Sequence, residues 1–326
     1  MSVLFYAENN GGKFKKSTFE LASYAAAVAA QHQTDAVAIS IGDVSESELS
    51  RLGQYGAGRV LQVNNEQLKS FVNQAYASVI AQAASHTNAT VVVLSASFTG
   101  KALAPRIAAK LNAGYVDGAI DLPVFNGASI TVRKGAFSGK AFADVTLSSA
   151  NKVISLIPNS YKLEEKPTTV SIESFQPEVR PGDFRAMVKE IVKASDKVSL
   201  PEAEIVVSGG RGLKGPENWG MVEELADLLG AATACSKPVS DAHWRPHSEH
   251  VGQTGIAVSP NLYIAIGISG AIQHLAGVSS SKTIVVINKD PEAPFFKAAD
   301  YGIVGDAFDV IPQLISAIRE FKSAHA

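Results

Sequence analysis

Residues 205–216 read IVVSGGRGLKGP, in which an apolar run, Ile205–Val207, leads directly into a loop with four glycines. Glycines let the backbone turn sharply and point several N–H groups at an anion. A helix is predicted next, over Trp219–Leu229, and its positive N-terminal end favours the same kind of ligand. The stretch therefore predicts the first strand, loop and helix of a parallel α/β domain that binds a nucleotide.

The loop also matches the G-x-G-x-x-G pattern of NAD sites, through residues 210–215. An NAD site needs an acidic residue near the end of the second strand, where it binds the ribose. The second predicted strand, Ala232–Cys235, is followed by Ser236 and Lys237 and by no carboxylate. Lys237 suits the extra phosphate of NADP, so an NAD(P) site stays open as an alternative.

A second glycine loop follows the predicted strand Leu262–Ile266. Ser269 is expected to cap a helix over Ile272–Ala276. The free N–H groups beside Gly270 are expected to form a second anion-binding site. Two phosphate-binding loops in one domain indicate a dinucleotide that contains a diphosphate.

Polar residues follow two further predicted strands of this domain. Asn288 comes after Thr283–Ile287, and Asp306 comes after Gly302–Val304. Ligands of open α/β sheets bind at the carboxyl ends of the strands, so both residues are candidate ligand contacts. The alternative is that each only caps a turn or a helix.

The first 115 residues alternate short apolar runs with longer helical patterns. The predicted strands are Val3–Tyr6, Ala36–Ile41, Arg59–Val63 and Val91–Leu94. The predicted helices are Thr18–Gln31, Glu66–Ala84 and Lys101–Leu111. Such alternation predicts a parallel sheet covered by helices.

The next stretch changes character, because strand-like pieces follow one another with no helix between them. They are Asp121–Phe125, Ser129–Val132, Lys140–Leu147 and Lys152–Ile157, and they predict an antiparallel extension at the edge of the first sheet. Four prolines between residues 158 and 181 indicate an extended connector, after which Asp183 is expected to cap a helix from Phe184 to about Lys193.

The pattern as a whole predicts an α/β protein of two domains. Residues 1–195 form a parallel-sheet domain with an antiparallel extension, and the connector begins at about residue 158. Residues 196–326 form a doubly wound nucleotide-binding domain.

Composition narrows the functional classes. Lys+Arg number 29 against Asp+Glu 31, with no basic block, which argues against nucleic-acid binding. The single cysteine, Cys235, excludes an internal disulfide and a cysteine-ligated iron–sulfur cluster. The chain has no apolar run of membrane-spanning length, and a strand begins at Val3, so no membrane insertion and a bacterial cytoplasmic location are expected. A processed mitochondrial matrix protein is the alternative.

His243, His247 and His250 form an H-x3-H-x2-H cluster with the spacing of some metal sites. Pro246 breaks any helical register, and neither a cysteine nor clustered carboxylates complete a ligand set. No metal is expected, and the segment is predicted to shape a pocket or an interface.

Several motifs point to one family. They are SGGRG (208–212), VGQTG (251–255), ISGAIQHLAG (268–277), INKDPEAP (287–294) and ADYGIVG (299–305), with looser matches at GKALAPRIAAKL (100–111) and SGKAFA (138–143). Together they resemble the α subunit of electron-transfer flavoprotein, and the resemblance covers the whole chain.

The resemblance implies one FAD in the C-terminal domain. The residues that would line it are Arg211, Ser236, Lys237, Val251, Gly252, Gln253, Thr254, Ser269, Gly270, Ala271, Ile272, Gln273, His274, Asn288 and Asp306. It places Thr254 near flavin N5, His274 near the C2 carbonyl, and Asn288 and Asp306 toward the adenosine end. A donor at the C2 carbonyl would stabilise the negative charge of a one-electron-reduced flavin.

The resemblance also implies a heterodimer whose β subunit carries AMP. It would accept electrons from flavin dehydrogenases, such as acyl-CoA dehydrogenases, and pass them to a downstream quinone oxidoreductase. No acid–base pair or nucleophile stands out, so a carrier is expected and not a substrate-turnover enzyme. The alternatives are an NAD(P)- or flavin-dependent dehydrogenase, a subunit of a bifurcating electron-transfer flavoprotein, and a non-catalytic adenine-nucleotide sensor.

Two positions depart from the family pattern. Lys237 stands where the family usually has Arg, which keeps the charge and loses the planar stacking face. Ile256 stands where Lys is common, which removes a positive charge. The loss of stacking at Lys237 implies a shifted flavin potential or a less stable semiquinone, and the two departures together predict a less stabilised anionic semiquinone than in family members with both charges.

Overall fold

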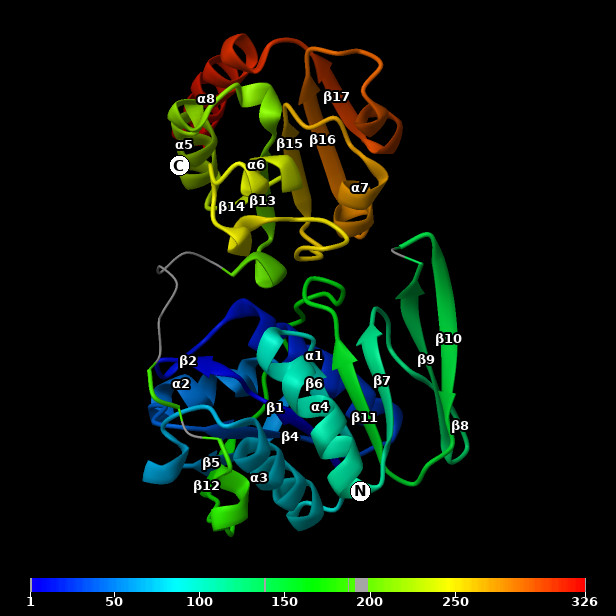
Figure 1. Ribbon diagram of the computed structural model, residues 1–326. Coiled ribbons are helices and arrows are strands. Elements are labelled where there is room, and N and C mark those ends of the chain that lie inside the picture. The colour runs from blue at the N-terminus through cyan, green and yellow to red at the C-terminus, as the bar shows by residue number, and fades with distance from the viewer. Residues whose placement is uncertain (1, 138, 187, 191–198, 326) are drawn as a thin grey trace. The chain divides into compact units, whose positions relative to one another are not determined.

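The computed structural model describes residues 2–137, 139–186, 188–190 and 199–325. The chain folds into two compact units, Met1–Ala136 with Phe142–Lys193 and Phe137–Ala141 with Ala194–Ala326. Each is an α/β structure built on one sheet with parallel strands at its centre (Figure 1). The predicted boundary after residue 195 lies outside the described residues.

The sheet of the first unit has ten strands, and its parallel part runs in the order β7-β11-β6-β1-β4-β5-β12 (Figure 1). These strands are β1 Ser2–Tyr6, β4 Asp35–Ile41, β5 Ala57–Val63, β6 Ala89–Ser95, β7 Gly114–Ala119, β11 Lys152–Leu156 and β12 Ser171–Ser174. Beyond β7 lie β8 Val124–Asn126, β9 Ser129–Ala136 and β10 Ala141–Leu147, with β9 antiparallel to both β7 and β8. The short strands β2 Asn9–Asn10 and β3 Lys13–Phe14 form a separate hairpin.

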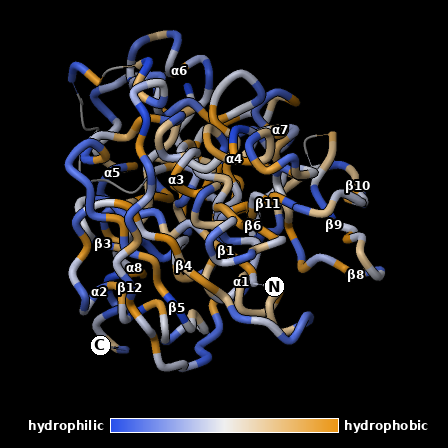
Figure 2. The backbone as a smooth tube through the Cα atoms, turned by 90° about the horizontal axis from the view of Figure 1, so that it is seen from below, coloured by the Kyte–Doolittle hydropathy of each residue, from blue (hydrophilic) through white to orange (hydrophobic). Residues whose placement is uncertain are grey.

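Helices cover both faces of this sheet. Successive side chains of a strand point to opposite faces, and in β1 Phe5 packs with α1 (Lys16–Gln31) while Leu4 packs with α3 (Asn73–His86) and α4 (Phe98–Leu111). Both faces are therefore buried, which explains why β1, β4 and β6 are nearly continuous apolar runs. The hydropathy colours of Figure 2 show these strands as largely hydrophobic. The unit also has a short helix, α2 (Glu46–Ser50).

The segment Lys152–Ile157 forms a strand as predicted, but its predicted place in the sheet was wrong. This segment forms β11, which lies parallel between β6 and β7 in the middle of the sheet and not in the antiparallel extension. All five residues of β11 are buried, as is typical of a central parallel strand. The neighbouring strand β7, whose sequence GYVDGA contains two glycines, was not predicted.

Three further predictions need correction. The helix expected over Glu66–Ala84 starts only at Asn73, after a 3-10 turn at Glu66–Leu68. The expected connector contributes β12, which pairs with β5. In place of a helix from Phe184, the chain forms a 3-10 turn at Pro181–Phe184, and residues 188–190 have no regular structure. The Asp183 carboxylate accepts from the Arg180 N–H within that turn, so it does not cap a following helix. Residues 191–193 of the expected helix lie outside the described ranges.

The second unit has a five-stranded, fully parallel sheet in the order β14-β13-β15-β16-β17. The strands are β13 Ile205–Gly209, β14 Ala232–Cys235, β15 Leu262–Ile266, β16 Thr283–Asn288 and β17 Tyr301–Val304. Counted along the chain this is the order 2-1-3-4-5 of a doubly wound sheet, whose ligands bind where the order reverses, at the carboxyl ends of β13 and β15. The predicted strands and fold class of this domain are confirmed.

Helices again lie on both faces of the smaller sheet. Helices α5 (Gly220–Leu229) and α8 (Ala307–Ala324) pack in one apolar cluster, and α7 (Ile272–Val278) packs in the other. The short helix α6 (Lys237–Asp241) begins directly after β14 (Figure 1). Within the described ranges, no helix combines the length and apolar character needed to cross a membrane.

Candidate functional site

The two glycine loops of the second unit contact each other backbone to backbone at the switch point. The Gly210 N–H donates to the Ile266 carbonyl at 2.8 Å, and the Gly212 N–H donates to the Gly267 carbonyl at 3.0 Å. A Cβ atom at Gly212 would lie 2.7 Å from the Gly267 Cα, closer than side chains pack. These glycines therefore serve close packing of the two loops.

This contact corrects the predicted anion cradle in the first loop. The amides of Gly210, Gly212 and Gly215 all donate to carbonyls of the protein, so they do not point at a ligand. The loop forms a 3-10 turn at Arg211–Leu213, and a second turn separates it from α5. The match to G-x-G-x-x-G has no phosphate-binding geometry behind it.

The second loop leads into α7 with a different cap from the predicted one. The N-cap is Ala271, without a side-chain hydrogen bond, and the Ser269 carbonyl accepts from the Phe295 N–H at 3.1 Å. Gly270 has a φ of +80°, and a Cβ there would lie 2.4 Å from the Phe295 Cβ. Among the described residues, the amides of Ala271, Ile272 and Gln273 find no hydrogen-bond acceptor.

The segment after α6 returns to the same edge of the sheet. Val251 donates to the Cys235 carbonyl at 3.0 Å, and the Gln253 N–H donates to the Gln273 carbonyl at 2.7 Å. These bonds attach the VGQTG turn to the end of β14 and to α7. The side chains of Gln253 and Thr254 are exposed at its tip.

A cavity of about 1150 Å³ opens between these loops. It is lined by most of the predicted residues: Arg211, Ser236, Lys237, Val251, Gly252, Gln253, Thr254, Ser269, Ala271, Gln273, His274 and Asn288. They come from the carboxyl ends of β13, β14, β15 and β16 and from the VGQTG turn, which are brought together by the parallel order of the strands.

Three predicted residues do not line this cavity. Gly270 and Ile272 flank residues that do. Asp306 caps α8 by accepting from the Phe308 N–H at 3.0 Å, and its carboxylate lies 3.7 Å from the Lys214 ammonium. Ile256, one of the two departures noted in the sequence, packs against the apolar core of the unit.

The cavity also has a set of lining residues that the sequence analysis did not assign to the ligand. These are Gly212, Pro238, Asp241, Ala242, His250, Gly267, Ile268 and Asp290. Asp241 lies one helical turn after Lys237 on α6, and Asp290 is two residues after Asn288, so spacing was an available signal for both. His250 was considered only as part of a metal pattern.

Charge is unevenly distributed in the cavity. The Lys237 ammonium lies 3.3 Å from the Asp241 carboxylate, so its charge is partly offset. Arg211, in contrast, forms no ion pair with any described residue. The Asn288 amide bridges two loops, since it donates to the Ile268 carbonyl at 3.0 Å and accepts from the Asp290 N–H at 3.0 Å.

Three buried polar atoms in the wall of the cavity lack any hydrogen-bond partner among the described residues. They are Ser236 Oγ, His250 Nδ1 and His274 Nδ1. Buried polar atoms are almost always paired, because an unpaired one costs about 1–3 kcal/mol. Their presence in one cavity fits a polar ligand, and a flavin ring edge carries both donors and acceptors.

Both histidines are neutral in this setting. Burial lowers the pKa of His274 to about 4, and the Val251 backbone opposes that effect only in part. Burial also lowers the pKa of His250, with further lowering from His247 and Lys237. At neutral pH each ring therefore has one N–H donor and one acceptor nitrogen.

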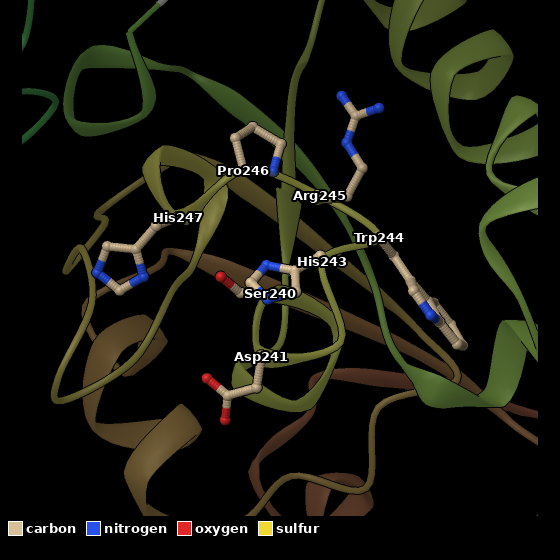
Figure 3. A pocket seen from close by; sticks show the side chains of 7 residues that line it. All are labelled: Ser240, Asp241, His243, Trp244, Arg245, Pro246 and His247. Carbon is tan, nitrogen blue, oxygen red and sulfur yellow. The ribbon is translucent and has the colours of Figure 1, made fainter.

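A smaller cavity of about 510 Å³ lies along the segment from Ser240 to His247 (Figure 3). His247 points away from His243 there, and His250 lines the larger cavity instead. The Arg245 guanidinium forms ion pairs with the carboxylates of Glu249, at 2.7 Å, and of Glu223 on α5, at 3.0 Å. No group of three His, Cys, Asp or Glu side chains able to hold a metal ion occurs in the described part of the chain.

Comparison with known proteins bears directly on this cavity. The family model described as "Electron transfer flavoprotein FAD-binding domain" matches residues 199–279, and the one described as "Electron transfer flavoprotein domain" matches residues 3–179. A relative from Bacillus subtilis named "Electron transfer flavoprotein subunit alpha" is 39% identical over 323 residues, covering 98% of each chain. "Protein FixB" from Clostridium saccharobutylicum is 36% identical, over 99% of this chain and 97% of its own.

One relative has a different printed name. "Acryloyl-CoA reductase electron transfer subunit beta" from Anaerotignum propionicum is 33% identical over 99% of this chain and 96% of its own. Two family models that together cover most of the chain, and relatives well above 30% identity over nearly full length, agree with the loop architecture described above. The chain belongs to the electron transfer flavoprotein α-subunit family and is a flavin electron-transfer subunit whose cofactor is FAD.

Proposed function

We propose that the 1150 Å³ cavity of the second unit is the FAD site. The observation that carries this proposal is that three buried polar atoms without a partner, on Ser236, His250 and His274, share the wall of one cavity. The cavity lies at the switch point of a doubly wound sheet, where such folds bind their ligands. It is large enough for an extended dinucleotide, because drug-sized ligands occupy about 300–1000 Å³.

The residues of the cavity divide into three roles. Arg211 and Lys237 supply positive charge for an anionic ligand, and Arg211 is the stronger candidate because no described carboxylate offsets it. Ser236, Thr254, Gln253 and His274 supply neutral donors and acceptors. Asn288 positions the loops on either side of it. Gly270, Ile272 and Asp306, which do not line the cavity, stay predictions as FAD contacts.

When bound, FAD supplies the one- and two-electron chemistry. The protein orients the ring and sets the local polarity. Neutral His274 and His250 present N–H groups without adding a full charge, and burial of their rings limits access of water. The hydrogen bonds made by these groups would set the flavin potential, since about 1.4 kcal/mol corresponds to a tenfold change in a one-electron equilibrium.

The remaining assignments follow from membership of the family. We infer that the chain pairs with a β subunit, and the naming of relatives as α subunits supports such a partner. We further propose that the β subunit carries AMP, that flavin dehydrogenases of the acyl-CoA dehydrogenase kind are the donors, and that a quinone oxidoreductase is the acceptor. A carrier role in the bacterial cytoplasm, without substrate turnover, completes the proposal.

Co-expression with the β subunit tests it. The purified complex is expected to be yellow, to release one FAD per α chain on denaturation, and to be reduced by an acyl-CoA dehydrogenase with its substrate. A matched variant, Ser236→Val, should retain the fold and lose FAD affinity, because Val adds no polar atom to pair with the ring. A colourless preparation that binds NADPH or ATP would overturn the assignment.

A further inference from the structure

The side chain of Tyr263 makes a contact that the proposed FAD site does not explain by itself. Tyr263 lies in the middle of the second sheet, on β15, and is completely buried. Its hydroxyl is 2.9 Å from Nε2 of His274, on α7. The Phe295 ring packs against both side chains, with centroids 6.4 Å from Tyr263 and 5.7 Å from His274. The pair thus packs against an apolar ring, with the Ser208 side chain beside Tyr263 and the Val251 backbone beside His274.

The direction of this hydrogen bond follows from which group holds a proton. Burial raises the pKa of the Tyr263 phenol and lowers the pKa of His274 to about 4, so at neutral pH the phenol is protonated and the imidazole is neutral. Besides the bond to Nε2, the Ser208 side chain lies close enough to the Tyr263 hydroxyl to lower its pKa as a hydrogen-bond partner. If Nε2 held the proton, the phenolic O–H would lose its acceptor at 2.9 Å in a buried site, at a cost of up to about 1–3 kcal/mol, and would have near it only the Ser208 oxygen, which forms no hydrogen bond of normal geometry.

We propose that Tyr263 is a positioning residue that donates to Nε2 and thereby keeps the His274 proton on Nδ1. This inference rests on the proposed FAD site, because it assigns Nδ1–H as the donor that the ring offers to the flavin. Nδ1 is buried and makes no hydrogen bond of normal geometry with the described residues, although the Val251 backbone acts on the His274 ring as a hydrogen-bond partner and raises its pKa; the residue lines the cavity.

Two consequences follow for the cofactor. The bond fixes the imidazole against a flip of its plane, so the donor stays in one place. An imidazole that accepts a hydrogen bond at one nitrogen is also a better donor at the other, because hydrogen bonds in a chain strengthen one another by about 10–30%. Both effects favour the more negatively charged state of the flavin, if the flavin accepts the hydrogen bond from Nδ1.

The test is a double-mutant cycle in the FAD-loaded complex with the β subunit. The variants are Tyr263→Phe, His274→Ala and the double variant, and the measured quantity is the one-electron midpoint potential of the flavin. We expect His274→Ala to change that equilibrium about tenfold, or about 59 mV. Tyr263→Phe should change it roughly threefold in the same direction, and it should have no effect when His274 is already absent.

A second readout does not depend on the flavin potential. In the complex carrying ¹⁵N-histidine in this chain, the His274 signals, assigned through His274→Ala, should show the Nδ1–H tautomer. In Tyr263→Phe they should show a mixture of both tautomers. Phe295→Leu is the packing control, because it removes a ring from both residues and leaves the hydroxyl in place. It should keep the Nδ1–H tautomer.

The outcomes separate the two proposals. A potential unchanged in His274→Ala would overturn the contact between His274 and the flavin, while the tautomer in Tyr263→Phe would still decide the role of Tyr263. A normal shift in His274→Ala combined with an unchanged tautomer in Tyr263→Phe would overturn the inference. A potential shift for Tyr263→Phe that persists in the His274→Ala background would overturn it as well.

Discussion

At the scale of single residues, Arg211 and Lys237 show how two cations in one cavity differ. Both line the proposed FAD site, but among the described residues only Lys237 has a carboxylate in ion-pair contact, Asp241 at 3.3 Å. A charge that is already paired gains less from an anionic ligand than one that is not. The sequence indicated both cations, and the i, i+4 spacing of Asp241 was an available signal for this difference, but no helix was predicted over Lys237–Asp241.

Arg211→Ala is therefore expected to weaken FAD binding about 10- to 100-fold. A hydrogen bond to a charged group is worth about 1.5–3 kcal/mol, and 1.4 kcal/mol is a factor of ten. Lys237→Ala should have a smaller effect, and Arg319→Ala, whose side chain pairs with Glu224 away from the cavity, none. Quenching of flavin fluorescence on titration measures the three dissociation constants. Equal losses for Arg211 and Lys237 would contradict this account.

His274 makes a second residue-scale prediction, for the pH dependence of stability. Its pKa is about 4 in the folded chain and about 6.5 in the unfolded chain, so below pH 6.5 the unfolded state binds more protons. Stability should consequently fall between pH 6.5 and pH 4, by up to roughly 3 kcal/mol from this group, and should not depend on it above pH 7.

The measurement uses intrinsic fluorescence, because both tryptophans, Trp219 and Trp244, lie in the second unit. The thermal midpoint of the wild-type chain should drop from pH 7 to pH 5, and His274→Gln should drop less. His325→Gln, at the exposed end of α8, serves as the control and should follow the wild type. A midpoint in His274→Gln that tracks the wild type at every pH would argue against a neutral, buried imidazole.

At the scale of elements, close backbone contacts position the loops of the site. Gly212 and Gly267 let the loops after β13 and β15 touch, and Gly252 and Gly277 do the same for the VGQTG turn and α7, where a Cβ at Gly277 would lie 2.6 Å from Gly252. The two glycine loops, which include Gly212 and Gly267, were interpreted from the sequence as phosphate-binding loops. The sequence could not reveal that the neighbours of these glycines are other loops, because those neighbours are more than fifty residues away in the first case.

Gly212→Ala tests this role. The added Cβ would meet the Gly267 backbone at 2.7 Å, which cannot move aside as a flexible side chain can. We expect a loss of about 1–3 kcal/mol in stability and weaker FAD binding. Gly220→Ala is the matched control, since nothing lies within 4 Å of its Cβ at the start of α5, and it should be neutral or stabilising by up to about 1 kcal/mol. Chemical denaturation followed by tryptophan fluorescence compares the two.

The two units differ in how well sequence periodicity predicts the positions of their strands. In the second unit each predicted strand was followed by a helix or a clear loop, so all five were found. In the first unit β11 was misplaced because its buried run, KVISL, follows antiparallel strands and has no helix before it. The sequence of a fully buried strand does not show whether the strand runs parallel or antiparallel to its neighbours. Its place in the sheet is therefore decided by the tertiary fold. The short strand β12 was missed for a different reason: its four residues, SIES, are exposed or half-buried and lie within a proline-rich stretch, so they show no apolar run.

At the scale of the whole molecule, the two units have separate apolar cores. One pair of core clusters contains only residues of the first unit, and the other pair only residues of the second. All the residues that line the proposed FAD site belong to the second unit. A ligand that binds only the folded form of a unit stabilises that unit by mass action.

FAD at about one hundred times its dissociation constant should therefore stabilise the second unit by about 2.7 kcal/mol, which corresponds to roughly 100-fold slower exchange of its most protected amides. Hydrogen exchange with mass spectrometry resolves this by peptide, with strands β13 and β15 as reporters and β1 and β4 as an internal reference. Slowing confined to the second unit is expected, because its core is distinct and the cavity lies within it. Equal slowing in β1 and β4 would mean that the units unfold together, and no slowing in β13 and β15 would mean that FAD is held elsewhere.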